Sequence, residues 1–227
     1  MGADQAAQGK GWSGPKGGDI SISPPSQHVL KQSAVWVDPG SGDVTAQFTV
    51  NLPARGRTIL GSRAIDIFDR IVPNFVSSSL IYSALNNSKL EKHILSVEDQ
   101  DWLRKQLSSR NLVAFVPNGA ILPRLSGADD RPMSDLKNSN VVRFQSPESL
   151  EVTFDLPSTK TKLKGMGIKK GVTLIVGGGF HGKSTLLSAL QYGIYDKIPG
   201  DGREFCVCDE NAVKIRAEDG RSVSSGM

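Results

Sequence analysis

An α/β fold is predicted for the C-terminal part of the chain by three features that follow one another without interruption. Residues 172–176, with the sequence VTLIV, form a continuous β-prone and largely apolar run, which is typical of a strand buried on both faces of a parallel sheet. The glycine-rich segment 177–184, GGGFHGKS, comes next. Leu186, Leu187 and Leu190 then recur at helical spacing. A strand, a glycine-rich loop and a helix in this order predict the core of a P-loop nucleotide-binding fold.

The segment 177–184 matches the pattern GxxxxGK[ST], and each residue type in it meets a need of polyphosphate binding. Glycines let backbone N–H groups surround the phosphates, and the N-terminus of the following helix adds the positive end of its dipole. The ammonium group of Lys183 suits the β and γ phosphates, and the hydroxyl of Ser184 suits Mg²⁺. The sequence therefore predicts a site for ATP and Mg²⁺, with Ser184 as the metal ligand. The predicted phosphate-binding residues are Gly177, Gly178, Gly179, Gly182, Lys183, Ser184 and Thr185.

The charge of the chain favours anionic partners, because 27 lysines and arginines face 23 carboxylates and the pI is near 9.1. Nucleotide, nucleic acid and acidic lipid all fit that charge. No acidic residue occurs between Asp155 and Asp196, a stretch that includes the glycine-rich segment and the lysines ahead of it. Two interpretations of the lysines in this region stay open, a solvated loop and a surface that steers or contacts nucleic acid. These lysines are Lys160, Lys162, Lys164, Lys169 and Lys170.

The composition also limits where the protein acts. No run of about eighteen apolar residues is present, and the N-terminus lacks the apolar stretch of a secretory signal. On a strand, the two cysteines, Cys206 and Cys208, would project from one face too far apart for an easy disulfide, and no second pair completes a metal site. We therefore expect a soluble intracellular protein without a membrane span, in the cytoplasm, with an organelle or the nucleus as alternatives.

Three regions are predicted along the chain. Residues 1–28 are rich in Gly, Ser and Pro and indicate a flexible arm. Residues 29–139 combine a hairpin of residues 35–37 and 43–50, helices on either side of Pro73, and a further helix whose start resembles a capping box at Ser96 and Asp99. Trp102 of that helix is interpreted as a core residue, and short apolar strands are predicted at residues 112–116, 141–144 and 150–154. Together these elements predict an α+β module ahead of the nucleotide-binding segment. Residues 140–227 would begin the nucleotide-binding domain.

Six longer strings of the chain are distinctive: NLPARGRTILG, LVAFVPNGAILPR, SGADDRP, KGMGIKKGVTLIVGGGFHGKSTLL, IPGDGREF and VKIRAEDGRSV. Taken together, they resemble the predicted ABC-class P-loop ATPase family, which is similar to ABC transporter ATPases but has no membrane domain. By this resemblance, Gly177, Gly182, Lys183 and Ser184 take the Walker A role, and two nucleotide domains close over ATP as a homodimer in the full-length form. The resemblance also implies that the N-terminal part contacts RNA. Arg55 and Arg57 belong to a family motif without an assigned role.

The resemblance implies an ABC-type core that is incomplete on its C-terminal side, because the signature, Walker B and switch histidine of the family are not recognisable in the 43 residues after Ser184. We expect a fragment of a longer ATPase that binds Mg-ATP, with weak or no hydrolysis, and no catalytic residue can be assigned. Asp209 is weighed as a magnesium-shell residue against a strand-end carboxylate. Phe154 is weighed as an adenine-stacking ring against core packing, and the second interpretation is preferred for both.

Two other functions remain open at this point. One is a nucleic-acid-binding module, for RNA by the resemblance, in which the nucleotide site regulates a basic N-terminal part. The other is a small-molecule kinase, which would need an acceptor pocket and a lid that the sequence does not reveal.

Overall fold

The computed structural model describes residues 16–133 and 141–215, and it divides the chain into two compact units. The N-terminal unit comprises residues 1–26 and 30–92, and the C-terminal unit comprises residues 27–29 and 93–227. The predicted boundary between residues 139 and 140 lies outside the described residues, as do residues 1–15 of the predicted arm and the AEDGRSV string. The described helices include none that is both long and apolar enough to cross a membrane.

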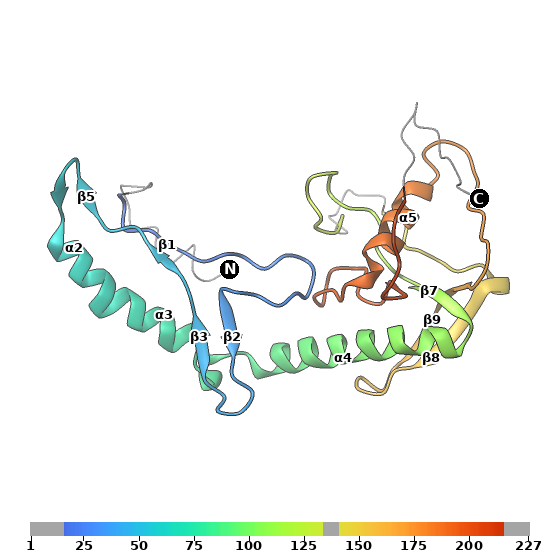
Figure 1. Ribbon diagram of the computed structural model, residues 1–227, viewed down its shortest axis with the longest axis horizontal. Coiled ribbons are helices and arrows are strands. Elements are labelled where there is room, and N and C mark those ends of the chain that lie inside the picture. Colours follow the sequence, from blue (N-terminus) through green and yellow to red (C-terminus); the bar gives the residue numbers. More distant parts are fainter. Residues whose placement is uncertain (1–15, 134–140, 216–227) are drawn as a thin grey trace, which may run out of the picture. The chain divides into compact units, whose positions relative to one another are not determined.

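The N-terminal unit consists of three short antiparallel strand pairs and one interrupted helix (Figure 1). The predicted hairpin is confirmed for residues 35–37 and 44–46, since Val35 pairs with Ala46 and the Asp38 carboxylate accepts hydrogen bonds from the N–H groups of Gly40 and Ser41 at 2.8 and 2.9 Å. The predicted single strand over residues 43–50 is wrong in its second half, because residues 49–50 pair with residues 20–21 instead. The strands are β1 (Ile20–Ser21) paired with β4 (Thr49–Val50), β2 (Val35–Val37) with β3 (Val44–Ala46), and β5 (Ala54–Arg55) with β6 (Thr58–Ile59).

The helix of this unit continues through Pro73, which the sequence analysis expected to interrupt it. It runs as α2 (Gly61–Asp66), the π-helical turn η1 (Ile67–Ile71) and α3 (Val72–Ser79), followed by the short η2 (Tyr82–Ala84). Proline lacks an N–H group and clashes with the carbonyl four residues earlier, and the wider π-helical turn directly before α3 accommodates it. Phe75 of α3 packs edge-on against Phe48, which fixes this helix on the strands.

The C-terminal unit is built on a four-stranded antiparallel sheet in the order β10-β7-β9-β8. Two predicted strands are confirmed, at residues 112–116 and 150–154. The third, at residues 141–144, is wrong: there only Phe144 exchanges backbone hydrogen bonds, with Gly119 and Ala120. The elements are α4 (Asn87–Ser109), which begins in the N-terminal unit, β7 (Leu112–Pro117), η3 (Glu148–Leu150), β8 (Glu151–Asp155), β9 (Lys162–Lys169), α5 (Lys183–Gln191), η4 (Tyr192–Ile194) and β10 (Val207–Cys208).

Two helices cover opposite faces of this sheet (Figure 1). Leu103 and Leu107 of α4 pack with Phe115 and Val207 on one face. Because side chains alternate along a strand, the adjacent residues Val116 and Cys206 point to the other face, where Ala189 of α5 packs. The segment that follows the glycine-rich loop is therefore part of the core.

Two aromatic residues belong to the first of these cores. Phe154 is fully buried, its ring lies 5.1 Å from that of Phe115, and the Arg110 guanidinium stacks 4.1 Å from the Phe154 ring centre. Trp102 meets the same ring edge-on. The preferred interpretation of Phe154 and Trp102 as core residues is thus confirmed, and adenine stacking on Phe154 is excluded by burial.

The predicted helix start at Ser96 and Asp99 is wrong, because both residues lie inside α4. The Asp99 carboxylate instead accepts hydrogen bonds from the backbone N–H groups of Ser158 and Thr159, at 2.8 and 2.9 Å. Asp99 therefore holds the turn that joins β8 to β9. The spacing of Ser96 and Asp99 is typical of a helix N-terminus, but in this protein the Asp99 carboxylate binds the backbone of a distant loop.

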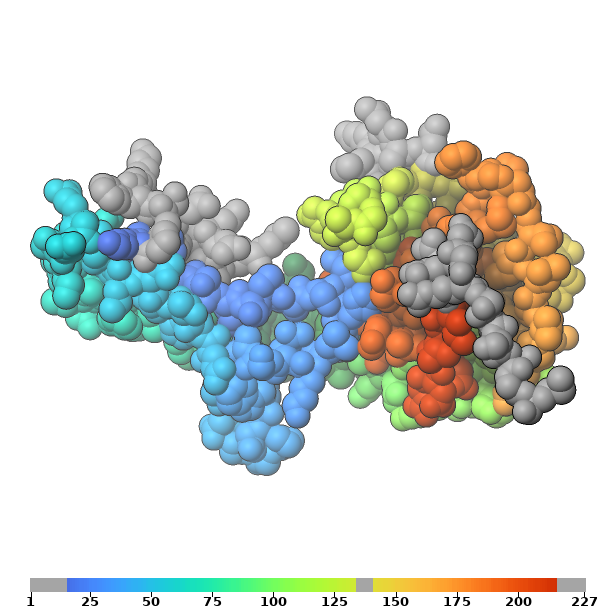
Figure 2. Space-filling view, turned by 45° about the horizontal axis from the view of Figure 1, so that its top comes forward, coloured from blue at the N-terminus to red at the C-terminus, as the bar shows by residue number. Residues whose placement is uncertain are grey.

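The predicted buried strand at residues 172–176 is also wrong in this structure. Val172 is fully exposed, Leu174 and Val176 are largely exposed, and no described strand pairs with this stretch. This part of the chain, coloured orange, lies at the surface of the C-terminal unit (Figure 2). The sheet ends at Lys169, and Gly171 turns the backbone with φ 117°. A single extended segment buries its apolar side chains only when neighbouring strands satisfy its backbone groups, and the described residues provide none.

A buried polar clasp fixes the segment that follows α5. The Gln100 carboxamide accepts a hydrogen bond from the N–H of Lys197 at 2.7 Å and donates to its carbonyl at 3.0 Å. The Lys197 ammonium, on a side chain that is almost fully buried, donates to the carbonyls of Tyr192 and Tyr195. Desolvation lowers the pKa of Lys197 to about 8. Residues 27–29 pair with the other edge of this segment, through the bridge between His28 and Lys197.

The sheet interior explains our first prediction, Gly165→Ala. A Cβ at this position of β9 would lie 2.6 Å from the Cα of Pro117 and 2.8 Å from the Phe115 ring, so a strand must move. We expect a loss of about 3 kcal/mol in the free energy of unfolding, measured by urea denaturation. Gly127→Ala, which meets no atom within 4 Å, is the control. Equal stability of the two variants would contradict this account of the sheet.

The clasp predicts a pH dependence. In the unfolded chain Lys197 has the ordinary lysine pKa of 10.5, whereas its pKa in the folded chain is about 8. Between these values the unfolded state binds more protons, so the free energy of unfolding rises with pH. Between pH 7.5 and 9 the contribution is about 1 kcal/mol. We expect the difference in unfolding free energy between the wild type and Lys197→Met to change by this amount in favour of the wild type.

The wild type and Lys197→Met share a second pH effect, which cancels when the unfolding free energy of one is subtracted from that of the other. Burial raises the pKa of the Cys206 thiol to about 12 and that of Cys208 to about 11, so these groups lower stability above pH 9 in both. A constant difference between the wild type and Lys197→Met over pH 7.5 to 9 would show that Lys197 does not titrate in this range.

Candidate functional site

The glycine-rich loop leads directly into α5, whose first residue is Lys183. Gly182 precedes the helix with φ 79°, a left-handed conformation that glycine adopts without strain. The first hydrogen bond of the helix runs from the Leu186 N–H to the Gly182 carbonyl at 2.8 Å. The N–H groups of residues 183–185 therefore have no helical acceptor and point toward the loop, as at the start of any helix.

The Lys183 side chain folds back over the loop. Its ammonium group donates a hydrogen bond to the Gly178 carbonyl, and its Cδ lies 3.7 Å from the position that a Cβ on Gly177 would take. A Cβ on Gly178 would come within 3.1 Å of the His181 ring. The loop thus leaves little room for side chains at residues 177 and 178, and it holds a mobile cation beside its backbone.

Phe180 is a loop residue with an unusual backbone conformation that the sequence pattern did not single out. It has φ 59°, a left-handed conformation that is strained for a bulky residue, and its ring is fully exposed. Glycine would meet the same backbone need without strain. The signal was present in the sequence, as an aromatic residue in the variable part of a glycine-rich loop.

The two hydroxyl residues after Lys183 differ in exposure. Ser184 is exposed, and its hydroxyl makes no hydrogen bond within the described residues, so the oxygen is available to a cation. Thr185 is half-buried in the first turn of α5. No cluster of three or more His, Cys, Asp or Glu residues that could hold a metal occurs in the described part of the chain.

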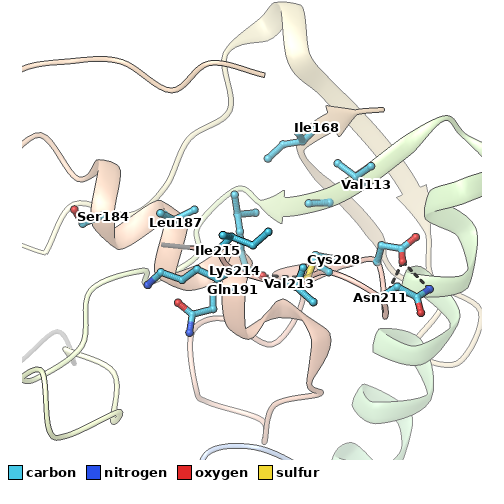
Figure 3. A pocket seen from close by; sticks show the side chains of 14 residues that line it. Val113, Ile168, Ser184, Leu187, Gln191, Cys208, Asn211, Val213, Lys214 and Ile215 are labelled. Atoms are coloured by element: carbon cyan, nitrogen blue, oxygen red, sulfur yellow. Dashed lines mark hydrogen bonds between the residues drawn. The ribbon is translucent and has the colours of Figure 1, made fainter. Parts of the chain in front are cut away.

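An open groove of about 1020 Å³ runs along α5 (Figure 3). Ser184 lies toward one end of the groove, Leu187 follows it on α5, and Val113 of β7 and Ile168 of β9 form part of the opposite wall. Residues 208, 209 and 211–215 line the groove as well. It borders the helix that carries Lys183, and its walls are mainly apolar.

Asp209, which follows β10, also lines this groove. Its carboxylate accepts hydrogen bonds from the backbone N–H and the side-chain amide of Asn211, at 3.0 and 3.2 Å, and these bonds hold the pKa of the carboxyl below its usual value. Asp209 and Ser184 line the same groove. Within the described residues, the hydrogen bonds of the Asp209 carboxylate are those with Asn211 (dashed lines in Figure 3).

The lysines ahead of the loop are partly neutralised. Lys162 lies 3.8 Å from Asp155 and Lys164 lies 3.5 Å from Glu151, both on the neighbouring strand β8. The Lys170 ammonium donates to the Ser108 hydroxyl at 3.0 Å. The interpretation as a solvated, paired strand surface therefore accounts for Lys162 and Lys164 without a ligand.

Two family models match the chain in succession. The model of the N-terminal part of ATPases of the ABC class matches residues 5–83, and the model of the P-loop domain of ABC ATPases matches residues 86–226. An uncharacterized protein of Methanocaldococcus jannaschii is 35% identical over 123 residues, which cover 52% of this chain and 27% of that relative. The match therefore spans about a quarter of the relative's length.

Proposed function

The chain belongs to the ATPases of the ABC class, and from this premise we propose that it binds the phosphates of Mg-ATP through residues 177–184. The observation that carries the proposal is the meeting of three groups at one point. These are the unbonded N–H groups at the start of α5, the glycine backbone of the loop and the ammonium group of Lys183. All three are positive or hydrogen-bond donating, which suits a polyphosphate.

Lys183 would change partner when the nucleotide enters. Its present acceptor is the neutral Gly178 carbonyl, and a phosphate oxygen is a stronger, charged acceptor at the same loop. Gly177, Gly178, Gly179 and Gly182 would supply backbone donors, and Thr185 would extend the row of N–H groups in the first turn.

Ser184 is the residue that fits Mg²⁺. Its exposed hydroxyl without a hydrogen-bond partner among the described residues is the kind of oxygen ligand that Mg²⁺ accepts beside phosphate oxygens and waters. Bound Mg²⁺ would neutralise phosphate charge, and Ser184 would set where it lies relative to Lys183.

The described residues support a proposal of ATP binding and not one of ATP hydrolysis. Hydrolysis needs a group that orients the attacking water and further charge at the γ phosphate. Asp209 is the carboxylate that shares the groove with Ser184, and Asn211 already engages it. In a longer form of the protein, two nucleotide domains closing over ATP as a homodimer would be the source of the further groups.

Lys183→Ala tests this function. Removing a charge-assisted hydrogen bond to phosphate should weaken Mg-ATP binding at least about 10-fold, measured by isothermal titration calorimetry on the 227-residue chain. Lys170→Ala removes the same charge outside the loop and should bind like the wild type. Equal affinity of Lys183→Ala and the wild type, or no binding by a folded wild type, would reject the proposal.

Asp209→Asn tests the role of the groove carboxylate. Because Asn211 holds the Asp209 carboxylate, we expect the affinity for Mg-ATP to change less than about 3-fold. The titration is done with Mg²⁺ and repeated with EDTA. A loss of 10-fold or more that is seen only with Mg²⁺ would instead make Asp209 part of the magnesium shell.

A second candidate function is nucleic-acid binding, RNA included, with the nucleotide site as its regulator. The observation that favours it is a group of exposed arginines in the N-terminal unit that form no ion pair within the described residues, namely Arg55, Arg57 and Arg63. The two functions do not exclude each other, because these arginines and Lys183 belong to different units of the chain.

A further inference from the structure

Four cations gather at the β5–β6 hairpin of the N-terminal unit. Arg55 ends β5, Arg57 lies in the turn, Arg63 lies in the first turns of α2, and Lys16 reaches the hairpin from the preceding segment. We call this group the basic hairpin. All four side chains are exposed, and Lys16, Arg55 and Arg63 line one small hollow together with Ala54 and Leu60.

The arginines of the basic hairpin have no carboxylate partner within the described residues. The contrast with Arg70, on the same helix, is direct: its guanidinium is held by both oxygens of Asp66, at 2.6 and 2.8 Å. Three unpaired arginines close together repel one another and raise the local positive potential. Binding of an anion would relieve this repulsion, so the three arginines favour an anionic ligand.

The hairpin presents these cations on a fixed backbone. Arg55 pairs with Thr58 and Ala54 pairs with Ile59, so the turn consists of Gly56 and Arg57. Gly56 has φ 61°, which glycine supplies in a two-residue hairpin turn. The Lys16 ammonium donates to the Gly56 carbonyl at 2.7 Å, and the Ala54 N–H donates to the Lys16 carbonyl at 3.1 Å. The tip is therefore held at two points besides its own strand pairing.

From this geometry we propose that the basic hairpin binds the phosphodiester backbone of a nucleic acid strand, with Arg55, Arg57 and Arg63 as the phosphate ligands. Guanidinium groups match phosphate oxygens in a bidentate fork. This proposal rests on the second candidate function, nucleic-acid binding, and assigns that function to specific residues. Lys16 has a structural part as well, since it already holds the turn.

A strand of repeating phosphates fits this surface better than a single phosphate does. Arg57 lies at the tip, outside the hollow that Arg55 and Arg63 line, so the cations are spread along the hairpin. Exposed apolar side chains flank them, with Ile59 77% and Leu52 57% exposed. Bases that leave the stack can lie on apolar surface while arginines hold the backbone.

The test compares the wild-type chain with the variant Arg55→Gln, Arg57→Gln, Arg63→Gln. Binding of a fluorescein-labelled 20-nucleotide single strand, as RNA and as DNA, is followed by fluorescence anisotropy between 50 and 300 mM KCl. Each lost phosphate contact lowers the slope of log K against log salt by about 0.7 for a single strand, so the variant should lose about 2. At 0.1 M salt this corresponds to about 100-fold weaker binding.

The matched control is Lys31→Gln, Lys89→Gln, Lys92→Gln, which removes the same charge from exposed positions of the same unit. It should keep most of the affinity, and Arg70→Gln, whose guanidinium is already paired, should keep the slope. Circular dichroism confirms that each variant is folded. The site is rejected if both triple variants lose the same affinity and slope, or if the hairpin variant binds like the wild type.

Further arms separate this inference from the functions on which it depends. If the wild type binds neither oligonucleotide, the second candidate function fails together with the site, while calorimetry with Mg-ATP still tests the first. If Lys183→Ala abolishes oligonucleotide binding when no nucleotide is present, the strand occupies the P-loop and the hairpin site is wrong. Stronger binding to phosphatidylserine vesicles than to either oligonucleotide, lost in the hairpin variant, would assign the hairpin to a membrane surface instead.

Discussion

The helix that follows the glycine-rich loop is positioned by burial of the two faces of one antiparallel sheet. Leu103 and Leu107 of α4 fill one face, and Ala189 of α5 fills the other against Val116 and Cys206. The loop itself is exposed and contributes little to the core. The direction of α5, and with it the direction in which its free N–H groups point, is therefore set by apolar contacts at its far end.

Buried hydrogen bonds then fix the conformations of the loops, which apolar packing alone does not determine. Gln100 and Asp99 lie next to each other on α4 and bind two separate backbone segments, at Lys197 and at residues 158–159. Buried polar groups cost free energy unless they are hydrogen-bonded, so these side chains favour one arrangement of the loops over alternatives with similar apolar burial. The Lys197 ammonium serves the same end after α5, where it satisfies two carbonyls.

Charge is distributed differently in the two units. In the C-terminal unit, Arg104 pairs with Asp196, Arg124 with Asp201 and Lys164 with Glu151, so much of the basic character is used internally. In the N-terminal unit the cations of the basic hairpin stay exposed without such partners among the described residues. The net positive charge of the sequence therefore says less about ligands than the pairing of each cation does, because a paired arginine offers little free energy to a phosphate.

The sequence by itself determined the elements whose signals are local. The pattern of residues 177–184 marks a helix start that the structure has at Lys183, strict alternation marks the β2–β3 hairpin, and the family strings run through both matched regions. The candidate phosphate-binding residues follow from that same local pattern, and their role stays a prediction.

Tertiary structure decided what depends on partners far away in the chain. Residues 172–176 have the composition of a buried strand, yet burial needs neighbouring strands, and within the described residues the sheet is completed by β10 and β8 instead. Asp99 has the spacing of a helix cap, yet it caps a loop about sixty residues away. Strand pairing and side-chain capping are both contacts between distant segments. A local sequence pattern shows that a segment can form such a contact, but it does not identify the distant residues that complete it.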